Sequence, residues 1–305
     1  MSGRLTKPRP IKLVLSYDGT DFSGWQRQKN ARSVQEELEK ALETMHGHPV
    51  RLTGAGRTDS GVHARGQAAG FFTDIKSIPA SKFMVALNKL LPQDIRVLAS
   101  EDGPEDFHAR FDASKRRYRY FMCSGRRMDA HMRRYAWYIG RRPSLLVLNA
   151  MAGRLLGEHD FSAFASAKDI SPSKSRYVAE SSFWYEGDLL VYQVTANAFL
   201  WRMVRSFVGT MIDIEQKTAD PAQALGMMEA VLASTSRAEA GPTAPPCGLF
   251  LWDVEYGERK HGHTRRKAPM HEQPMLEPQE EAEAELAAPL SRLVPGLGYL
   301  SSADS

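Results

Sequence analysis

The stretch Ile11-Lys12-Leu13-Val14-Leu15-Ser16-Tyr17, followed by Asp18-Gly19, begins the patterned part of the chain. Its apolar residues fall largely on alternate positions, and Asp-Gly is typical of a turn, so the pattern predicts a strand over 11–17. The next pattern, Ser33-Val34-Gln35-Glu36, is a capping box, and apolar residues at helical spacing follow it. A strand and then an amphipathic helix are therefore expected to open the fold.

Further along, strand-like alternation and helical spacing of apolar residues recur in an order that predicts a sheet covered by helices. We expect a short strand near 49–53, a strand near 66–73, a helix after Ser81 and a strand over 95–99. The order β-α-β-β-α-β is that of a split βαβ unit, which builds a mostly antiparallel sheet with helices on one side.

The second half of the chain has the same ingredients in a less regular order. Expected strands cover 117–123, 134–139, 178–184, 188–196 and 249–256, and expected helices cover 144–156, 199–215 and 221–233. The end of the chain lacks the apolar density needed to order it. We predict an α+β protein with a flexible N-terminus over 1–10, an N-terminal half over 11–110, a C-terminal half over 111–256 and a disordered tail over 257–305.

The composition excludes several classes of protein. The 305 residues are 42% hydrophobic and carry a net charge of +4 with a pI near 9.0, which weakly favours a polyanionic partner. Only two cysteines, Cys123 and Cys247, are present, which excludes a disulfide framework and a cysteine-ligated zinc site. No run of about 18 apolar residues exists, so no membrane span is expected. These features predict a cytoplasmic protein.

Residues 107–142 concentrate cationic and aromatic side chains. Ten arginines and one lysine accompany only two carboxylates, Asp112 and Asp129. Arginines bind phosphates and aromatic rings stack on splayed bases, so this composition favours an RNA partner. A solvated strand face with inward aromatic rings would also give the alternation in Arg117-Tyr118-Arg119-Tyr120, and this alternative stays open.

The segment Gly54-Ala55-Gly56-Arg57-Thr58-Asp59-Ser60-Gly61-Val62-His63-Ala64 lies between two expected strands. It lacks the Gly-Lys-Ser/Thr of a P-loop, and no long apolar helix follows it directly, which disfavours a nucleotide site. Two interpretations remain. Asp59-Ser60-Gly61 is only a turn, or Asp59 is a buried carboxylate that a cation such as Arg57 keeps ionised. Such a carboxylate can act as a nucleophile or a base in a water-poor cleft.

This segment resembles the active-site motif of the bacterial tRNA pseudouridine synthase A family, in which an Arg-Thr-Asp-Ala/Ser-Gly-Val-His run holds the catalytic aspartate. Other blocks between residues 11 and 256 resemble the family in the same order. They are Tyr17-Asp18-Gly19-Thr20-Asp21-Phe22-Ser23-Gly24-Trp25-Gln26, Ala86-Leu87-Asn88, Leu91-Pro92-Gln93-Asp94-Ile95, Phe107-His108-Ala109-Arg110-Phe111, Arg117-Tyr118-Arg119-Tyr120, His159-Asp160-Phe161, Asn197-Ala198-Phe199-Leu200-Trp201-Arg202-Met203-Val204-Arg205 and Thr243-Ala244-Pro245-Pro246-Cys247-Gly248-Leu249.

The resemblance implies both a fold and an activity. The fold is the pseudouridine synthase fold, in which two ferredoxin-like, split βαβ halves form a largely antiparallel central sheet, flanked by helices, with a central cleft. The activity is that of an isomerase that converts uridine to pseudouridine at positions 38, 39 and 40 in the anticodon stem-loop of tRNA, after the base has been flipped out. No metal, redox cofactor or nucleotide cofactor is implied. The expected partners are tRNA and a second copy of the chain in a homodimer.

Catalytic roles follow where this sequence matches the family's motifs. The resemblance makes Asp59 the essential carboxylate, Tyr118 the tyrosine against the target base, and Arg205 the arginine that pairs with the aspartate. An apolar stripe along the helix around Arg205 agrees with this role, because a buried arginine at the edge of a stripe needs an acidic partner or a phosphate. An arginine that extends to solvent is the alternative.

Four further residues are expected to bind substrate. Arg57 would orient Asp59 or hold the phosphate of the flipped nucleotide, Arg110 would contact the RNA backbone, and Arg117 belongs to the arginine-rich strand. His63 follows the motif, and a structural or RNA-contacting role is commoner for such a histidine than a role as a proton shuttle. Two rival functions remain: an RNA-binding protein without turnover, and a synthase that acts on another RNA or another stem.

Overall fold

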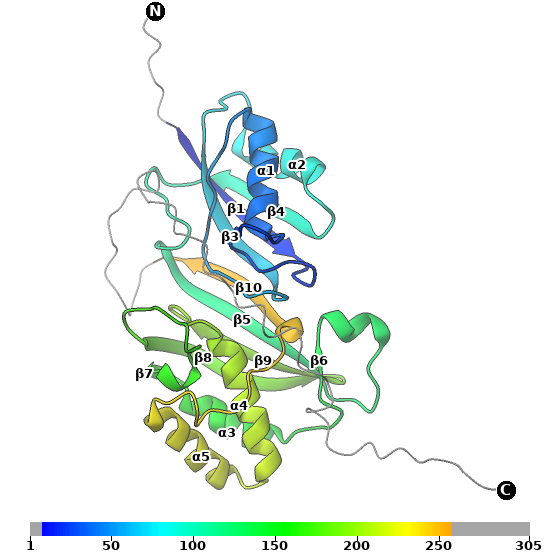
Figure 1. Ribbon diagram of the computed structural model, residues 1–305, viewed down its shortest axis with the longest axis vertical. Coiled ribbons are helices and arrows are strands. Elements are labelled where there is room, and N and C mark those ends of the chain that lie inside the picture. The colour runs from blue at the N-terminus through cyan, green and yellow to red at the C-terminus, as the bar shows by residue number, and fades with distance from the viewer. Residues whose placement is uncertain (1–7, 258–305) are drawn as a thin grey trace, which may run out of the picture.

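One mixed sheet runs through the molecule, which is described over residues 8–257 by a computed structural model (Figure 1). The sheet has ten strands in the order β4-β1-β3-β10-β5-β9-β8-β7, with β2 paired to β3 and β6 paired to β5. The strands are β1 (Arg9–Tyr17), β2 (Thr53–Gly54), β3 (His63–Thr73), β4 (Ile95–Asp102), β5 (Ala113–Cys123), β6 (Trp137–Tyr138), β7 (Gly157–Asp160), β8 (Ser175–Glu186), β9 (Leu189–Ala196) and β10 (Leu249–Tyr256). Most neighbours along this order are antiparallel, which confirms the predicted α+β class.

Five α-helices flank the sheet in two groups (Figure 1). They are α1 (Val34–His46), α2 (Phe83–Leu90), α3 (Leu145–Arg154), α4 (Met203–Lys217) and α5 (Pro221–Ser234). In the first group, Phe83 of α2 packs on Phe71 of β3 with 5.5 Å between the ring centroids. In the second group, the amide of Asn149 on α3 exchanges two hydrogen bonds with the backbone of Phe183 on β8. Each group buries the apolar stripe of its helices against the strands.

The last strand joins the two halves of the chain. Strand β10 pairs in parallel with β3, where Leu251 lies beside Ala64, and antiparallel with β5, where Leu251 lies beside Tyr118. Paired residues point to the same side of a sheet, so these three side chains share the face that carries the helices. The sheet is therefore continuous across the expected boundary at 110/111, and the centre of its helical face lies where the two halves meet.

Several element boundaries differ from the sequence-based expectations. The strand expected near 49–53 is only Thr53–Gly54, the strand expected over 134–139 is only Trp137–Tyr138, and β7 was not expected. Helix α4 begins at Met203 and not at residue 199, because Arg202 has a left-handed φ of 65° that a helix cannot contain. Half of the predicted capping box is present: the Ser33 side chain accepts a hydrogen bond from the backbone of Glu36, whereas the Glu36 side chain pairs with Lys40.

The segments expected at the two chain ends lie mostly outside the described residues. The flexible segment expected over 1–10 overlaps β1, which already contains Arg9 and Pro10, and residues 1–7 lie outside the described part. The disordered tail expected over 257–305 also lies outside it, except for Gly257. Between residues 8 and 257, none of the helices is both long and apolar enough to cross a membrane.

Candidate active site

The loop between β2 and β3 carries Asp59 and is fixed at Thr58. The Thr58 hydroxyl is 2.8 Å from the Tyr17 hydroxyl, and its carbonyl accepts a hydrogen bond from the Trp25 backbone at 3.0 Å. Gly24 makes this close approach possible: its φ is +94°, and a Cβ atom there would lie 2.6 Å from the Thr58 carbonyl oxygen. The motif around Tyr17–Trp25 therefore acts as a clamp on the loop that holds Asp59.

Two buried side chains that the sequence analysis missed also hold this loop. Gln67 on β3 donates to the carbonyl of Gly56 at 2.7 Å and accepts from its N–H at 3.3 Å. Arg116 on β5 donates to the carbonyls of Ala55 and Asn197, at 3.0 and 2.8 Å. The alternation of side chains along β5 could have revealed Arg116, because it places Arg116 on the same face of the sheet as Tyr118.

Asp59 and Arg205 form an ion pair at the centre of the helical face. Arg205 Nη1 donates to Asp59 Oδ2 at 2.9 Å, and the two side chains are 7% and 19% exposed. Arg205 Nε also donates to the carbonyl of Ala244 at 2.8 Å, which fixes the plane of the guanidinium. No other hydrogen bond reaches the Asp59 carboxylate from residues 8–257, so Oδ1 has no protein partner there. A carboxylate held on one oxygen and open on the other is suited to reaction.

The turn before α4 places Arg205, and Asp169 holds this turn. Its carboxylate accepts a hydrogen bond from the Trp201 N–H at 2.6 Å and from Lys174 Nζ at 2.6 Å, and only 5% of the Asp169 side chain is exposed. Burial by itself would raise the pKa of Asp169, but the hydrogen bonds from Lys174 and from Trp201 lower that pKa to about 2. The ionised carboxylate thus stabilises the left-handed Arg202 and the helix start that follows it.

Tyr118, on β5, points to the helical face of the sheet and lies beside Asp59. Its ring packs edge-on against Phe199, with 4.9 Å between centroids, and a Cβ atom on Gly56 would lie 3.7 Å from its hydroxyl oxygen. Burial raises the pKa of Tyr118, and the nearby Asp59 carboxylate also raises it, so the phenol is neutral at physiological pH. Among residues 8–257 the Tyr118 hydroxyl forms no hydrogen bond, which leaves this donor available to a bound base.

Arg57 and Arg110 form a pair of cations at the edge of this site. Both side chains are exposed by surface area, and neither has an ion-pair partner in the part of the chain that the structure describes. Partial burial lowers the pKa of both guanidinium groups, and repulsion by Arg110 lowers that of Arg57 further. Two adjacent cations without a carboxylate are a suitable site for an anion such as a phosphate.

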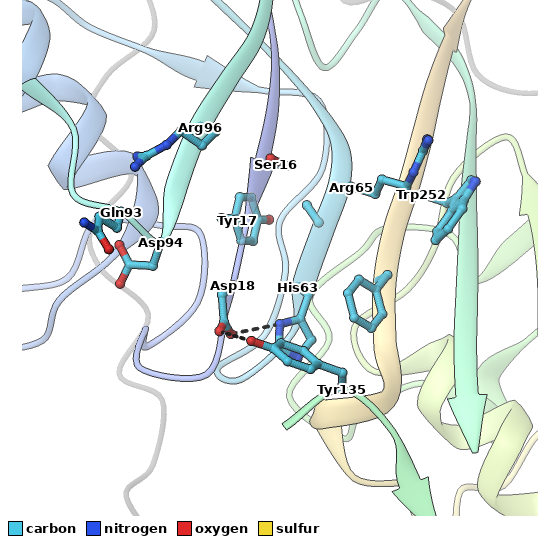
Figure 2. A pocket seen from close by; sticks show the side chains of 12 residues that line it. Ser16, Tyr17, Asp18, His63, Arg65, Gln93, Asp94, Arg96, Tyr135 and Trp252 are labelled. Carbon is cyan, nitrogen blue, oxygen red and sulfur yellow. Dashed lines mark hydrogen bonds and ion pairs between the residues drawn. The ribbon is translucent and has the colours of Figure 1, made fainter. Parts of the chain in front are cut away.

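His63 lies away from Asp59, on the other face of the sheet. Its Nδ1 accepts from the Gly19 N–H at 3.0 Å, its Nε2 is 2.9 Å from the carbonyl of Arg134, and its ring stacks on Phe250. Burial lowers the pKa of His63, although Asp18 opposes this effect, so the neutral tautomer with the proton on Nε2 fits both hydrogen bonds. Figure 2 shows His63 beside Asp18 and Tyr135 at a cavity of about 320 Å³ that Asp59 does not line.

Arg117 also lies on the face opposite Tyr118. Its guanidinium contacts Asp253 at 2.6 Å, Glu255 at 3.2 Å and Glu180 at 3.5 Å. Adjacent residues of a strand point to opposite sides, so Arg117 and Tyr118 cannot contact the same bound base. Of the seven residues selected from the sequence, the structure brings Asp59, Tyr118 and Arg205 together, places Arg57 beside Arg110, and separates His63 and Arg117 from them.

The relatives of the chain show its family. A family model described as tRNA pseudouridine synthase matches residues 13–112 and 151–257. The chain is 49% identical over 253 residues to the tRNA pseudouridine synthase A of Treponema denticola, which covers 81% of this chain and 93% of that protein. The chain belongs to the tRNA pseudouridine synthase family. The resemblance found in its motifs is therefore confirmed, and the chain is an isomerase.

The chain is also similar to a second curated protein and, weakly, to a solved structure. The tRNA pseudouridine synthase A of Bacillus subtilis is 41% identical over 248 residues, which cover 81% of this chain and 98% of that protein. The crystal structure of a Cbf5–Nop10–Gar1 complex matches with a TM-score of 0.30 and 9% identity, over 65% of this chain and 43% of that chain. This structural similarity is too low to support an argument. Within residues 8–257, no group of three or more His, Cys, Asp or Glu side chains is arranged to hold a metal ion.

Proposed function

We propose that this synthase converts uridine to pseudouridine at positions 38, 39 and 40 in the anticodon stem-loop of tRNA. The observation that carries the proposal is the buried Asp59–Arg205 pair beside Tyr118, in a member of the tRNA pseudouridine synthase family. The three positions come from the resemblance of the motifs to the synthase A family. The reaction joins C1′ of the ribose to C5 of the same base and needs no group from outside the substrate.

Asp59 supplies the ionised carboxylate of the reaction. The C1′–N1 bond breaks and a C1′–C5 bond forms, while C5 loses a proton and N1 gains one, so atoms and charge balance. Arg205 holds one carboxylate oxygen, which fixes the orientation of the group and leaves the other oxygen for the nucleotide. Because a stacked base cannot reach Asp59, the uridine is flipped out of the stem before it reacts.

Tyr118 lies against the flipped base and takes part in the proton transfer at C5. Its neutral phenol can donate a hydrogen bond to the base, and its ring stays in place by packing on Phe199. Tyr118→Phe removes only the hydroxyl, so we expect kcat to fall by about tenfold or more while the folded state keeps its stability. A kcat equal to that of the unmodified protein would remove Tyr118 from the chemistry.

Arg57 and Arg110 bind the phosphates next to the flipped nucleotide. They are the exposed arginines beside the site that lack a carboxylate, so a phosphate would relieve the repulsion between them. Arg117 and His63 are not included in this contact, because both lie on the other face of the sheet. We also propose a homodimer in the cytoplasm, and light scattering of the active protein with and without tRNA tests the dimer. A monomer that turns over tRNA would contradict it.

The deciding experiment is incubation of the protein with unmodified tRNA transcripts, followed by chemical mapping of pseudouridine at single-nucleotide resolution. Product at positions 38–40 is expected. A matched transcript with cytidine at these three positions controls for modification elsewhere. Product only at other positions would retain the isomerase and contradict the anticodon target, whereas tight binding without product would favour an RNA-binding protein without turnover.

A further inference from the structure

Eight of the ten arginines of residues 107–142 fall into two sets; the other two are Arg110, beside Arg57, and Arg142, whose guanidinium lies over the Tyr185 ring. One set has partners inside the protein: Arg116 on carbonyls, Arg117 and Arg119 on carboxylate or amide groups, Arg134 on Asp21 and Arg141 on Glu215. A second set lies beyond the end of β5, in the segment 124–142, which we call the arginine loop. Its Arg126, Arg127 and Arg133 are exposed and form no ion pair or side-chain hydrogen bond with residues 8–257.

The backbone of the arginine loop is anchored, so these side chains extend from a defined surface. The Tyr138 hydroxyl donates to the carbonyl of Arg126 at 2.9 Å, and the Cys123 thiol donates to the carbonyl of Arg127 at 3.5 Å. Ser124 donates from both its N–H and its hydroxyl to the Asp188 carbonyl, each at 2.8 Å. A cavity of about 1280 Å³ lies among these turns.

The arginine loop and the loop that carries Asp59 both contact the segment Pro246–Cys247. The Cys247 thiol donates to the carbonyl of Ala136 in the arginine loop, and the adjacent Pro246 packs on Gly61, where a Cβ atom would come within 3.0 Å of its ring. In Figure 1 the green segment after β5 extends past the end of the sheet beside β6. The part of the arginine loop around Ala136 therefore lies near the loop that carries Asp59.

The charge of the arginine loop selects a polyanion as its partner. Residues 124–142 contain six arginines and a single carboxylate, Asp129. Arginine is the side chain best suited to phosphate, through charge and paired N–H donors. The loop lies within residues 113–150, between the two stretches that the family model matches.

We propose that Arg126, Arg127 and Arg133 bind backbone phosphates of the tRNA whose uridine occupies the Asp59 site, as a second contact outside the catalytic cleft. The proposal rests on the proposed function for the identity of the RNA. The contact holds the substrate and takes no part in the chemistry, so it acts on tRNA affinity and leaves the rate of the bound complex unchanged.

The salt dependence of tRNA binding tests this contact. The triple variant Arg126→Gln/Arg127→Gln/Arg133→Gln keeps the anchored backbone, since only carbonyls of Arg126 and Arg127 bond to the rest of the protein. Each lost phosphate contact lowers the slope of log K against log salt by roughly 0.7 to 0.9, so the slope should fall by about 2. KM for a tRNA transcript should rise by about tenfold with kcat unchanged.

A control removes the same three charges from arginine and lysine side chains that already have partners. Lys40→Gln/Arg154→Gln/Lys217→Gln replaces cations paired with Glu36, Glu229 and Asp213. This control should keep the wild-type slope and KM, and thermal unfolding verifies that both triple variants fold.

The outcomes separate this proposal from the proposed function. A wild-type slope and KM in the arginine-loop variant would overturn the contact, and a slope lowered equally in the control would reduce it to an effect of net charge. Absence of pseudouridine from the wild-type reaction would contradict the proposed function, while the slopes measured by binding alone would still decide the contact.

Discussion

The two faces of the sheet at β5 differ in how far their polar groups are satisfied. On the helical face, the Tyr118 hydroxyl and one oxygen of Asp59 have no hydrogen-bond partner among residues 8–257. On the other face, the neighbouring Arg117 contacts three carboxylates. A polar group that the protein leaves without a partner in an open site is available to a group that arrives with the substrate. A fully paired group indicates a structural role.

The same contrast separates two arginines that both contact carboxylates. Arg205 has one carboxylate partner and is almost fully buried, so removal of its charge leaves Asp59 without compensation. Arg117 has three carboxylate partners that are 37% to 48% exposed, and water can replace it. The number and exposure of their carboxylate partners therefore predict that substitution of Arg205 affects catalysis and substitution of Arg117 does not.

Asp59→Ala should have the largest effect. We expect kcat to fall by at least about 10³-fold, because the variant loses the group that reacts. Affinity for tRNA should stay within roughly tenfold, because phosphate contacts dominate binding. Asp253→Ala, which removes a carboxylate from the other face, is the matched control and should keep kcat. Single-turnover assays with saturating enzyme measure the rate of each variant. Turnover of Asp59→Ala at the rate of the control would refute the role of Asp59.

Arg205→Ala should reduce both the rate and the stability of the protein. It leaves the Asp59 carboxylate partly buried without its cation, so the free energy of unfolding should fall by about 3 kcal/mol. The rate constant kcat should fall by about 100-fold, since the Asp59 carboxylate loses the hydrogen bond that orients it. Urea denaturation and single-turnover kinetics measure the two effects. A variant that is less stable but equally fast would separate Arg205 from catalysis and leave it a structural residue.

The sequence predicted the residues on the helical face of the sheet better than those on the opposite face. The motifs selected Asp59, Tyr118 and Arg205, which the structure brings together. The order of strands and helices predicted the α+β sheet, because local patterns carry this information. The partners of Arg117 come from β8 and β10, distant in sequence, so only the strand register reveals them. The left-handed Arg202 was missed for a similar reason, since its support is the distant Asp169.

Asp169→Asn tests the support of the helical face and should have an intermediate, pH-dependent effect. The pKa of Asp169 is lowered to about 2 in the folded protein from 3.8, so its ionised form stabilises the fold above pH 3.8. This contribution, about 2 kcal/mol, is lost as the pH falls toward 2. The variant should therefore be less stable than the wild type at pH 6, and the difference should shrink between pH 4 and pH 2. Urea denaturation at each pH measures it, and a difference that does not depend on pH would assign the effect to packing.

Arg117→Gln should have the smallest effect, and it is the substitution best placed to break the comparison of the two faces. Its partners are partly exposed, so we expect a loss of about 1 kcal/mol in the free energy of unfolding. This loss should decrease in 1 M salt, where the Debye length is only about 3 Å. The slope of tRNA binding against salt and kcat should both match the wild type, because the guanidinium is already neutralised on the face opposite Asp59. A lower slope would place RNA on both faces of the sheet, and a lower kcat would mean that the carboxylate network of β10 positions Tyr118 through the paired strand β5.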